Sequence, residues 1–263
     1  VAERVSRGYH RPGIPTIPGP AMPPPLLLLT RPEAQAQAFA AALEAAGARF
    51  QAVISPLIAT VETGPLPPLD GATGLIFSSA AGVRAYTALG GPGGLRAWTV
   101  GAATARAARA AGLDAAMAGE TADALVAALI AAPPRRPLLH LHGRHTRGAI
   151  ADRLTAAGVT TSTATIYEQP ARPPTDAARA ALQGARPVVA PLFSPRTAAL
   201  LATVPRKSPL LVAAMSDAVA NAARPLHSRA LRCAARPDHA AMVALTARLL
   251  DEAAALETQE GRE

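Results

Sequence analysis

The chain has 263 residues, half of them hydrophobic, a length that suits two domains of roughly 100–130 residues. It contains one cysteine, Cys233, and no run of about 18 apolar residues, which excludes an internal disulfide framework and a membrane-spanning helix. The net charge of +8, carried almost entirely by arginine, indicates an anionic partner or an arginine-rich genome, and the 3% of aromatic residues argues against nucleic acid.

The chain begins with residues 1–25, which are rich in proline and glycine and follow neither a helix nor a strand period. We expect an extension outside the fold, with Met22 as the natural start. Leu26–Leu29 is then a continuous apolar run, as in a buried parallel strand. Thr30-Arg31-Pro32-Glu33 has the spacing of a capping box that opens a helix, and Gly47 ends this helix.

Strands and helices alternate through nearly all of the remaining chain. Strands are expected at 53–59, 74–77, 98–100, 138–141, between Gly158 and Tyr167, and at 188–193, 210–213 and 231–233. Helices are expected after Ser79, over 104–111, after Thr121, over 145–157, after Ser194, after Ser216 and over 239–255. This alternation predicts an α/β fold with parallel sheets covered by helices on both faces.

The sequence also contains an internal repeat. Leu43-Glu-Ala-Ala-Gly47 is matched by Leu154-Thr-Ala-Ala-Gly158, 111 positions later, and Phe77-Ser78 is matched by Phe193-Ser194, 116 positions later. One supersecondary unit is therefore used twice, which predicts two similar doubly wound lobes. Tyr167, at the end of the strand that follows Gly158, stands where one copy meets the next.

Four strand ends carry small hydroxyl residues directly before a helix. They are Ser78-Ser79, the segment from Gly101 to Thr104, Ser194 and Ser216. Ligands of open parallel sheets bind beyond the carboxyl ends of the strands, where the next helix offers free N–H groups. Each corner therefore presents donors to an acidic ligand, and the alternative is that each Ser or Thr is an ordinary N-cap. If the two lobes face each other, the corners line one cleft.

Six short motifs follow one another in a particular order. They are the strand into Thr30-Arg-Pro, Phe-Ser-Ser at 77–79, Val-Gly-x-x-Thr-Ala at 100–105, Gly-x-x-x-Arg at 143–147, the Gly158…Tyr167 strand and Phe-Ser-Pro at 193–195. In this order they resemble the uroporphyrinogen-III synthase family over about residues 26–250. The chain departs from the family at Ala80-Ala81, where a polar or charged residue is usual, and at Ala213 and Ser216, which replace glycine and threonine.

The resemblance implies two lobes that are not the two halves of the sequence. Residues 26–52 with 173–257 would form one lobe and residues 61–162 the other, with extended crossings at 53–60 and 163–172. Tyr167 would then lie in the hinge beside the cleft. We expect a monomer.

The resemblance also implies a reaction. The family cyclises hydroxymethylbilane, a linear tetrapyrrole with eight carboxylates, to uroporphyrinogen III and uses no cofactor. The terminal hydroxyl leaves to give an azafulvene, and attack by the substituted carbon of the last pyrrole forms a spiro intermediate that recloses with this ring inverted. We expect the substrate to be handed over by hydroxymethylbilane synthase. Unassisted closure yields the uninverted isomer, so a bias of a few hundredfold requires about 3–4 kcal/mol, which positioning can supply.

By the same resemblance, Tyr167 is the catalytic candidate and assists the departure of the hydroxyl. Free tyrosine is a poor proton donor at neutral pH, so we expect its help to be a hydrogen bond; the alternative is a half-buried packing role. The candidate substrate-binding residues are Arg31, Ser78, Ser79, Gly101, Thr104, Arg144, Arg147, Ser194 and Ser216. For the arginines the alternative is solvation of a helix start.

Other classes of function are less well supported. His140 and His142 share a strand face, but no fixed carboxylate or thiol completes a metal site, and no metal is expected. A two-lobed binding protein for a small polyanion, without chemistry, remains an alternative, although no export signal or effector domain is present. A sugar-nucleotide transferase is disfavoured because no Gly-x-Gly-x-x-Gly or Walker loop occurs. The missing signal peptide and the single cysteine predict a cytoplasmic location.

Overall fold

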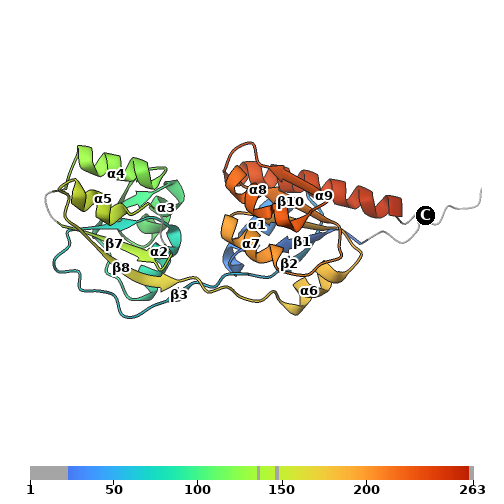
Figure 1. The fold of residues 1–263 in the computed structure, drawn as a ribbon, viewed down its shortest axis with the longest axis horizontal. Helices are drawn as coiled ribbons and strands as arrows, with labels where there is room; N and C mark the ends of the chain where they lie inside the picture. The colour runs from blue at the N-terminus through green and yellow to red at the C-terminus, as the bar shows by residue number, and fades with distance from the viewer. Residues whose placement is uncertain (1–22, 135–136, 146–147, 261–263) are drawn as a thin grey trace, which may run out of the picture.

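The structure is a computed structural model that describes residues 23–134, 137–145 and 148–260. The extension expected at 1–25 lies outside the described residues except for 23–25, which form no helix or strand. The described chain alternates between strands and helices and builds two sheets (Figure 1). The predicted α/β fold with parallel sheets is therefore confirmed. No helix of the described ranges is long and apolar enough to cross a membrane.

Lobe 1 is built on a parallel five-stranded sheet with the order β11-β10-β9-β1-β2. Its strands are β1 (Leu26–Leu29), β2 (Gln51–Ile54), β9 (Val188–Leu192), β10 (Leu210–Ala214) and β11 (Ala230–Cys233). One face packs against α6 (Asp176–Gln183), α7 (Pro195–Ala202), α8 (Asp217–Ala223) and the 3₁₀ turn Arg224–Leu226. The other face packs against α1 (Glu33–Ala45) and α9 (His239–Glu260).

Strand β1 shows why helices cover both faces of this sheet. Leu26 and Leu28 pack into the cluster that includes α6, α7 and α8, whereas Leu27 and Leu29 pack against α1 and α9. Successive side chains of a strand point to opposite faces, so a strand that is apolar at every position needs a layer on each side. All four leucines are buried, and the end of β1 is thereby held rigidly beside the start of α7.

Lobe 2 is built on a six-stranded sheet with the order β3-β8-β7-β4-β5-β6. Its strands are β3 (Val61–Glu62), β4 (Gly74–Phe77), β5 (Arg96–Val100), β6 (Asp114–Gly119), β7 (Leu138–Gly143) and β8 (Thr161–Glu168). One face packs against α2 (Ala80–Ala88) and α3 (Ala102–Ala110), the other against α4 (Ala122–Ala131) and α5 (Ile150–Ala156). The helix expected over 145–157 is thus shorter than predicted.

Two strands of lobe 2 were not expected from the sequence. β6 has the sequence Asp-Ala-Ala-Met-Ala-Gly, which shows no β-branched residue and no apolar alternation, and it is a strand because it pairs with the edge of β5. β3 has two residues and pairs antiparallel with β8, so this sheet is mixed at one edge. The glycine stops were predicted correctly, since Gly47 and Gly158 have φ of +83° and +85°, the left-handed conformation that ends a helix.

The chain passes between the lobes twice, after β2 and after β8 (Figure 1). The two connecting segments run antiparallel and are joined by the bridge between Ile58 and Ala171. The Ala59 N–H donates to the Pro170 carbonyl at 3.1 Å, and the Arg172 N–H donates to the Leu57 carbonyl at 2.9 Å. Residues 163–168, placed in the second crossing by the sequence, belong to β8, because this part of the strand pairs with β7. We call the paired segments 55–60 and 169–174 the hinge ribbon.

Candidate functional site

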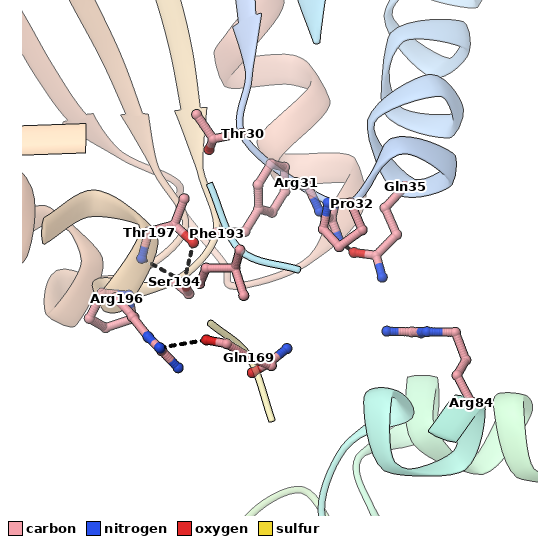
Figure 2. A pocket seen from close by; sticks show the side chains of 12 residues that line it. Thr30, Arg31, Pro32, Gln35, Arg84, Gln169, Phe193, Ser194, Arg196 and Thr197 are labelled. Atoms are coloured by element: carbon pink, nitrogen blue, oxygen red, sulfur yellow. Dashed lines mark hydrogen bonds between the residues drawn. The ribbon is translucent and has the colours of Figure 1, made fainter. Parts of the chain in front are cut away.

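Two pockets lie where the lobes and the hinge ribbon meet. The first, the arginine pocket, has a volume of about 400 Å³ and is lined from both lobes (Figure 2). Its lining residues are Thr30, Arg31, Pro32, Gln35, Ile58, Arg84, Gln169, Phe193, Ser194, Pro195, Arg196 and Thr197. The second, the tyrosine pocket, has a volume of about 340 Å³ and is lined by Ser78, Ser79, Ala81, Val100, Ala122, Gly143, His145, Tyr167 and Gln169. Gln169 lines both pockets, so they are neighbours along the hinge ribbon.

Tyr167 lies near the end of β8, and only 7% of it is exposed. Its hydroxyl is 2.9 Å from Ser79 Oγ, and its ring lies over Gly143, where a Cβ atom would come within 2.6 Å of the ring carbons. A glycine at position 143 is therefore required by the close approach of the ring. The tyrosine is half of a polar pair at the pocket surface and also part of the apolar cluster under α2 and α3.

The corner after β4 is organised by two serines with different partners. Ser79 is the N-cap of α2, and its Oγ accepts a hydrogen bond from the Gly82 N–H at 3.3 Å. Ser78 Oγ is 3.4 Å from Nε2 of His140, which is 2% exposed. Burial, and next the neighbouring His142, lowers the pKa of His140 to about 4. The imidazole is therefore neutral at neutral pH and serves the serine as a hydrogen-bond partner.

In the arginine pocket, the described partners of Arg31 are neutral groups. Its guanidinium lies over the ring of Phe193, 4.0 Å from the centroid, and donates to Gln35 Oε1 at 2.9 Å. Burial, and next the charge of Arg84, lowers the pKa of Arg31. The described residues that line the pocket include no aspartate or glutamate. The pocket therefore has an uncompensated positive charge and suits an anionic ligand.

The capping box predicted at Thr30 does not form. Helix α1 begins at Glu33 with Pro32 at its N-cap position and has no side-chain cap hydrogen bond. Thr30 is 3% exposed, and its Oγ1 has no hydrogen-bond partner within the described part of the chain. The extended backbone of Pro32 carries the chain away from Thr30 before the helix starts, which is why the hydroxyl is not used as a cap. It is instead a free hydrogen-bonding group in the wall of the arginine pocket.

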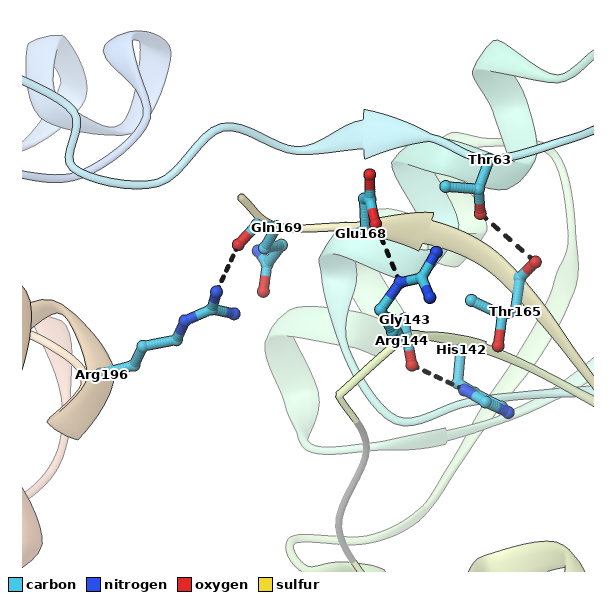
Figure 3. A network of polar contacts seen from close by, with 8 residues as sticks. All are labelled: Thr63, His142, Gly143, Arg144, Thr165, Glu168, Gln169 and Arg196. Carbon is cyan, nitrogen blue, oxygen red and sulfur yellow. Dashed lines mark hydrogen bonds and ion pairs between the residues drawn. The ribbon is translucent and has the colours of Figure 1, made fainter. Parts of the chain in front are cut away.

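Helix α7 begins at the same pocket. Ser194 caps it, because Ser194 Oγ accepts from the Thr197 N–H at 3.1 Å and lies 2.8 Å from the Thr197 hydroxyl. Arg196, in the first turn, donates to the carbonyl oxygen of Gln169 at 2.6 Å (Figures 2 and 3). This bond ties the first turn of α7 to the hinge ribbon just beyond β8.

The structure brings together some of the predicted residues and separates others. Arg31 and Ser194 line the arginine pocket, and Ser78, Ser79 and Tyr167 line the tyrosine pocket. The remaining described candidates, Gly101, Thr104, Arg144 and Ser216, line neither pocket.

Each of these outlying residues has a local position of its own. Gly101 is the N-cap of α3 with φ of +75°, and Thr104 is buried in that helix. Arg144 forms an exposed ion pair of 2.9 Å with Glu168 (Figure 3). Ser216 precedes α8 without a side-chain cap bond. Arg147 lies outside the described residues.

Among the pocket residues that the sequence did not mark as site residues are Thr30, Arg84, Gln169 and Arg196. Arg196 could have been found, since it follows the Phe-Ser-Pro corner directly. Arg84 had only a weak signal, its place in the second turn of the helix after Ser78-Ser79. No local pattern marks Gln169, which reaches the site because the hinge ribbon passes there.

The described residues include no group of three or more His, Cys, Asp or Glu side chains arranged to hold a metal ion. The rings of His140 and His142 are 4.8 Å apart between centroids. His142 is engaged on both sides, with Nδ1 2.7 Å from the Gly143 carbonyl oxygen and Nε2 2.6 Å from Thr163 Oγ1. The two histidines thus act as hydrogen-bonding groups within the sheet.

The family model described as uroporphyrinogen-III synthase HemD matches residues 37–244. No curated protein matches the sequence.

Among solved structures, uroporphyrinogen-III synthetase from Helicobacter pylori superposes with a TM-score of 0.62 at 13% identity, covering 86% of this chain and 99% of that chain. A mutant uroporphyrinogen III synthase from the extremely thermophilic bacterium Thermus thermophilus gives a TM-score of 0.47 at 15% identity, covering 86% and 99%. The Helicobacter structure shares the fold of this chain.

Proposed function

The chain belongs to the uroporphyrinogen-III synthase family, and we propose that it cyclises hydroxymethylbilane to uroporphyrinogen III with inversion of the terminal pyrrole ring. The observation that carries the proposal is the arginine pocket, which both lobes line with guanidinium and hydroxyl groups and with no carboxylate. A linear tetrapyrrole with eight carboxylates has the charge that such a pocket requires.

Binding is divided between the two pockets. In the arginine pocket, Arg31 and the start of α7 at Ser194 receive substrate carboxylates, because a guanidinium and a helix N-terminus both stabilise negative charge. In the tyrosine pocket, Ser78 and Ser79 offer hydroxyls at the carboxyl end of β4. For the parts of the substrate that extend further, the proposed contacts remain Gly101, Thr104, Arg144, Arg147 and Ser216.

Tyr167 assists the first chemical step. The C–O bond of the terminal hydroxymethyl group breaks, the hydroxyl departs as water with a proton, and the loss of the pyrrole N–H proton balances the azafulvene that forms. Ser79 Oγ accepts from the Gly82 N–H and lies 2.9 Å from the phenol oxygen. In the arrangement we propose, the Ser79 hydroxyl donates to the phenol oxygen, so the phenol hydrogen is available to the leaving hydroxyl.

The later steps are controlled by geometry. The substituted carbon of the last pyrrole attacks the azafulvene methylene, and the resulting spiro intermediate breaks and recloses with this ring inverted. A few-hundredfold preference over direct closure corresponds to about 3–4 kcal/mol. Two walls that belong to different lobes and meet at a hinge can supply this by holding one conformation of the chain.

The proposal includes the organisation of the protein. Residues 26–52 with 173–257 and residues 61–168 act as two lobes about crossings at 53–60 and 169–172, because residues 163–168 belong to β8. The enzyme is a monomeric, cofactor-independent hydro-lyase of the cytoplasm that receives its substrate from hydroxymethylbilane synthase. The lone cysteine, Cys233, which is free, is in keeping with a reducing compartment.

A coupled assay tests the function. Fresh hydroxymethylbilane is generated in the presence of the purified chain, and the uroporphyrinogen isomers are resolved after oxidation. Formation of isomer III above the spontaneous background is expected, and isomer I alone would refute the function and leave a polyanion-binding protein. Tyr167→Phe, which removes the phenol oxygen and keeps the ring, is expected to lower turnover with the fold intact; unchanged turnover would remove Tyr167 from the mechanism.

A further inference from the structure

Two guanidinium groups from opposite lobes line one pocket. Arg31 follows β1 in lobe 1, and Arg84 projects from α2 in lobe 2. In Figure 2, the side chain of Arg84 extends from its helix toward the wall formed by Arg31 and Gln35. The two charges are close enough that Arg84 contributes to the lowered pKa of Arg31. Each lobe therefore contributes one positive charge to the pocket, and the two charges repel each other.

Neither charge is neutralised within the described chain. Arg31 donates to the neutral amide of Gln35 and stacks on Phe193. The ion pairs of the described residues join other arginines to their acids and include neither Arg31 nor Arg84. An arginine that is partly buried without a counter-ion is a binding group for an anion that the chain does not itself supply.

A second observation points to the same ligand. Thr30 lines the arginine pocket, and its buried Oγ1 has no hydrogen-bond partner among the described residues. A buried hydroxyl without a partner is uncommon, because it loses its hydrogen bond to water without replacement. A carboxylate beside Arg31 accepts a hydrogen bond from this hydroxyl and satisfies both groups at once. The lobe 1 wall is thus one carboxylate site, with Arg84 facing it from lobe 2.

The link between the lobes is slender. It consists of the hinge ribbon, with the Ile58–Ala171 bridge and the hydrogen bonds beside it, and of the bond from Arg196 to the Gln169 carbonyl. Leu57 anchors the ribbon in the lobe 1 core, but between the lobes the ribbon has only two strands, and an isolated pair of strands is only marginally stable. Repulsion between Arg31 and Arg84 therefore acts between two lobes that can move about the hinge ribbon. A polyanion bound between the two guanidinium groups turns this net repulsion into a net attraction.

We propose that Arg31 with Thr30, on lobe 1, and Arg84, on lobe 2, form a clamp that binds carboxylates of one polycarboxylate ligand and draws the lobes together. In the free protein the two guanidinium groups hold the lobes apart; in the complex the carboxylates between them hold the lobes closed. The clamp deepens the proposed function, on which the identity of the natural ligand as a tetrapyrrole rests. Arg84 is then a specificity-determining residue, which makes the protein bind polycarboxylates in preference to neutral pyrroles.

The binding test uses uroporphyrin I, a fluorescent macrocycle with eight carboxylates that cannot be cyclised. Its Kd is measured by fluorescence titration at about 150 mM salt for the wild type, Arg31→Gln, Arg84→Gln and Arg106→Gln. Arg106 is an exposed arginine of α3 in lobe 2 that does not line the pocket, so it controls for the loss of one positive charge. We expect Arg84→Gln and Arg31→Gln to weaken binding about tenfold, as for a charge-assisted hydrogen bond, and Arg106→Gln less than twofold.

The closure test measures the distance between the lobes. The distance is measured by pulsed electron–electron double resonance between two nitroxide labels. One label is on Cys233, at the end of β11, and the other on the cysteine of Ala110→Cys, at the end of α3. Uroporphyrin I is expected to shorten the distance in the wild type and not in Arg84→Gln. In the free protein, high salt is expected to shorten the distance, because it screens the repulsion, and Arg84→Gln is expected to do so at low salt.

The clamp is overturned if wild-type protein fails to bind uroporphyrin I, if Arg84→Gln binds as tightly as Arg106→Gln, or if the ligand leaves the distance unchanged. Its failure is distinguishable from failure of the proposed function. If uroporphyrin I binds and shortens the distance between the lobes as expected, but the coupled assay gives no isomer III, the function is refuted and the clamp stands. Isomer III formed equally by the wild type and Arg84→Gln would keep the function and overturn the clamp.

Discussion

Replacing Gly143 by alanine perturbs the packing of Tyr167 without touching the tyrosine itself. Gly143 ends β7, and a Cβ atom built there would lie 2.6 Å from Cε2 and Cζ of the Tyr167 ring and 3.0 Å from its hydroxyl oxygen. Carbon atoms do not approach this closely, so the ring must move. Gly143 is not among the glycines with positive φ, and its backbone therefore accepts an alanine without strain of its own.

The size of the effect follows from these contacts. To reach an ordinary carbon–carbon separation, the ring has to move by roughly 1 Å, which breaks the hydrogen bond to Ser79 Oγ. Overpacking costs about 1–3 kcal/mol, and the lost hydrogen bond about 1 kcal/mol. We expect the free energy of unfolding to fall by about 2–4 kcal/mol, and turnover to isomer III to fall about a hundredfold, as for a 1 Å misplacement of a catalytic group.

Urea unfolding and the isomer-resolved assay measure these two quantities. Gly71→Ala is the matched control, because a Cβ atom at Gly71 would meet nothing within 4 Å and its φ is not positive. We expect this control to change the free energy of unfolding by less than about 0.5 kcal/mol. In a Tyr167→Ala background, Gly143→Ala should lose most of its effect on stability. If it destabilises equally there, or no more than Gly71→Ala, the packing argument is refuted.

Two further predictions concern the serine corners and the buried histidine. Because the pKa of His140 is lowered from 6.5 to about 4, the unfolded chain takes up the proton first as the pH falls; stability is full above about pH 6.5 and decreases toward pH 4 by up to about 3 kcal/mol. Urea unfolding at pH 7 and 4.5 should show a smaller decrease for His140→Gln than for the wild type, and equal decreases would contradict this. Ser194→Ala removes a cap bond to α7 and should destabilise the protein by about 1 kcal/mol, whereas Ser216→Ala, at an N-cap without such a bond, should cost clearly less. Equal losses in urea unfolding would show that the Ser194 bond is not the cause.

The sequence by itself determined the fold class and the ends of many elements. The run Leu26–Leu29 is apolar at every position because both of its faces are buried, and this is visible in four consecutive letters. Gly47 and Gly158 mark helix ends because the left-handed backbone there excludes most other residues. Such features depend on each residue and its near neighbours, so a local pattern records them.

Tertiary structure decided the features that depend on distant neighbours. β6 is a strand because it pairs with the edge of β5. Thr30 does not cap α1, because the chain turns away from Thr30 before the helix starts. The pairing of Arg31 with Arg84, and the place of Gln169 between two pockets, arise where segments far apart in the chain meet. No local pattern encodes such a meeting, because the free energy that enforces it comes from the packing of whole sheets and helices about the hinge ribbon.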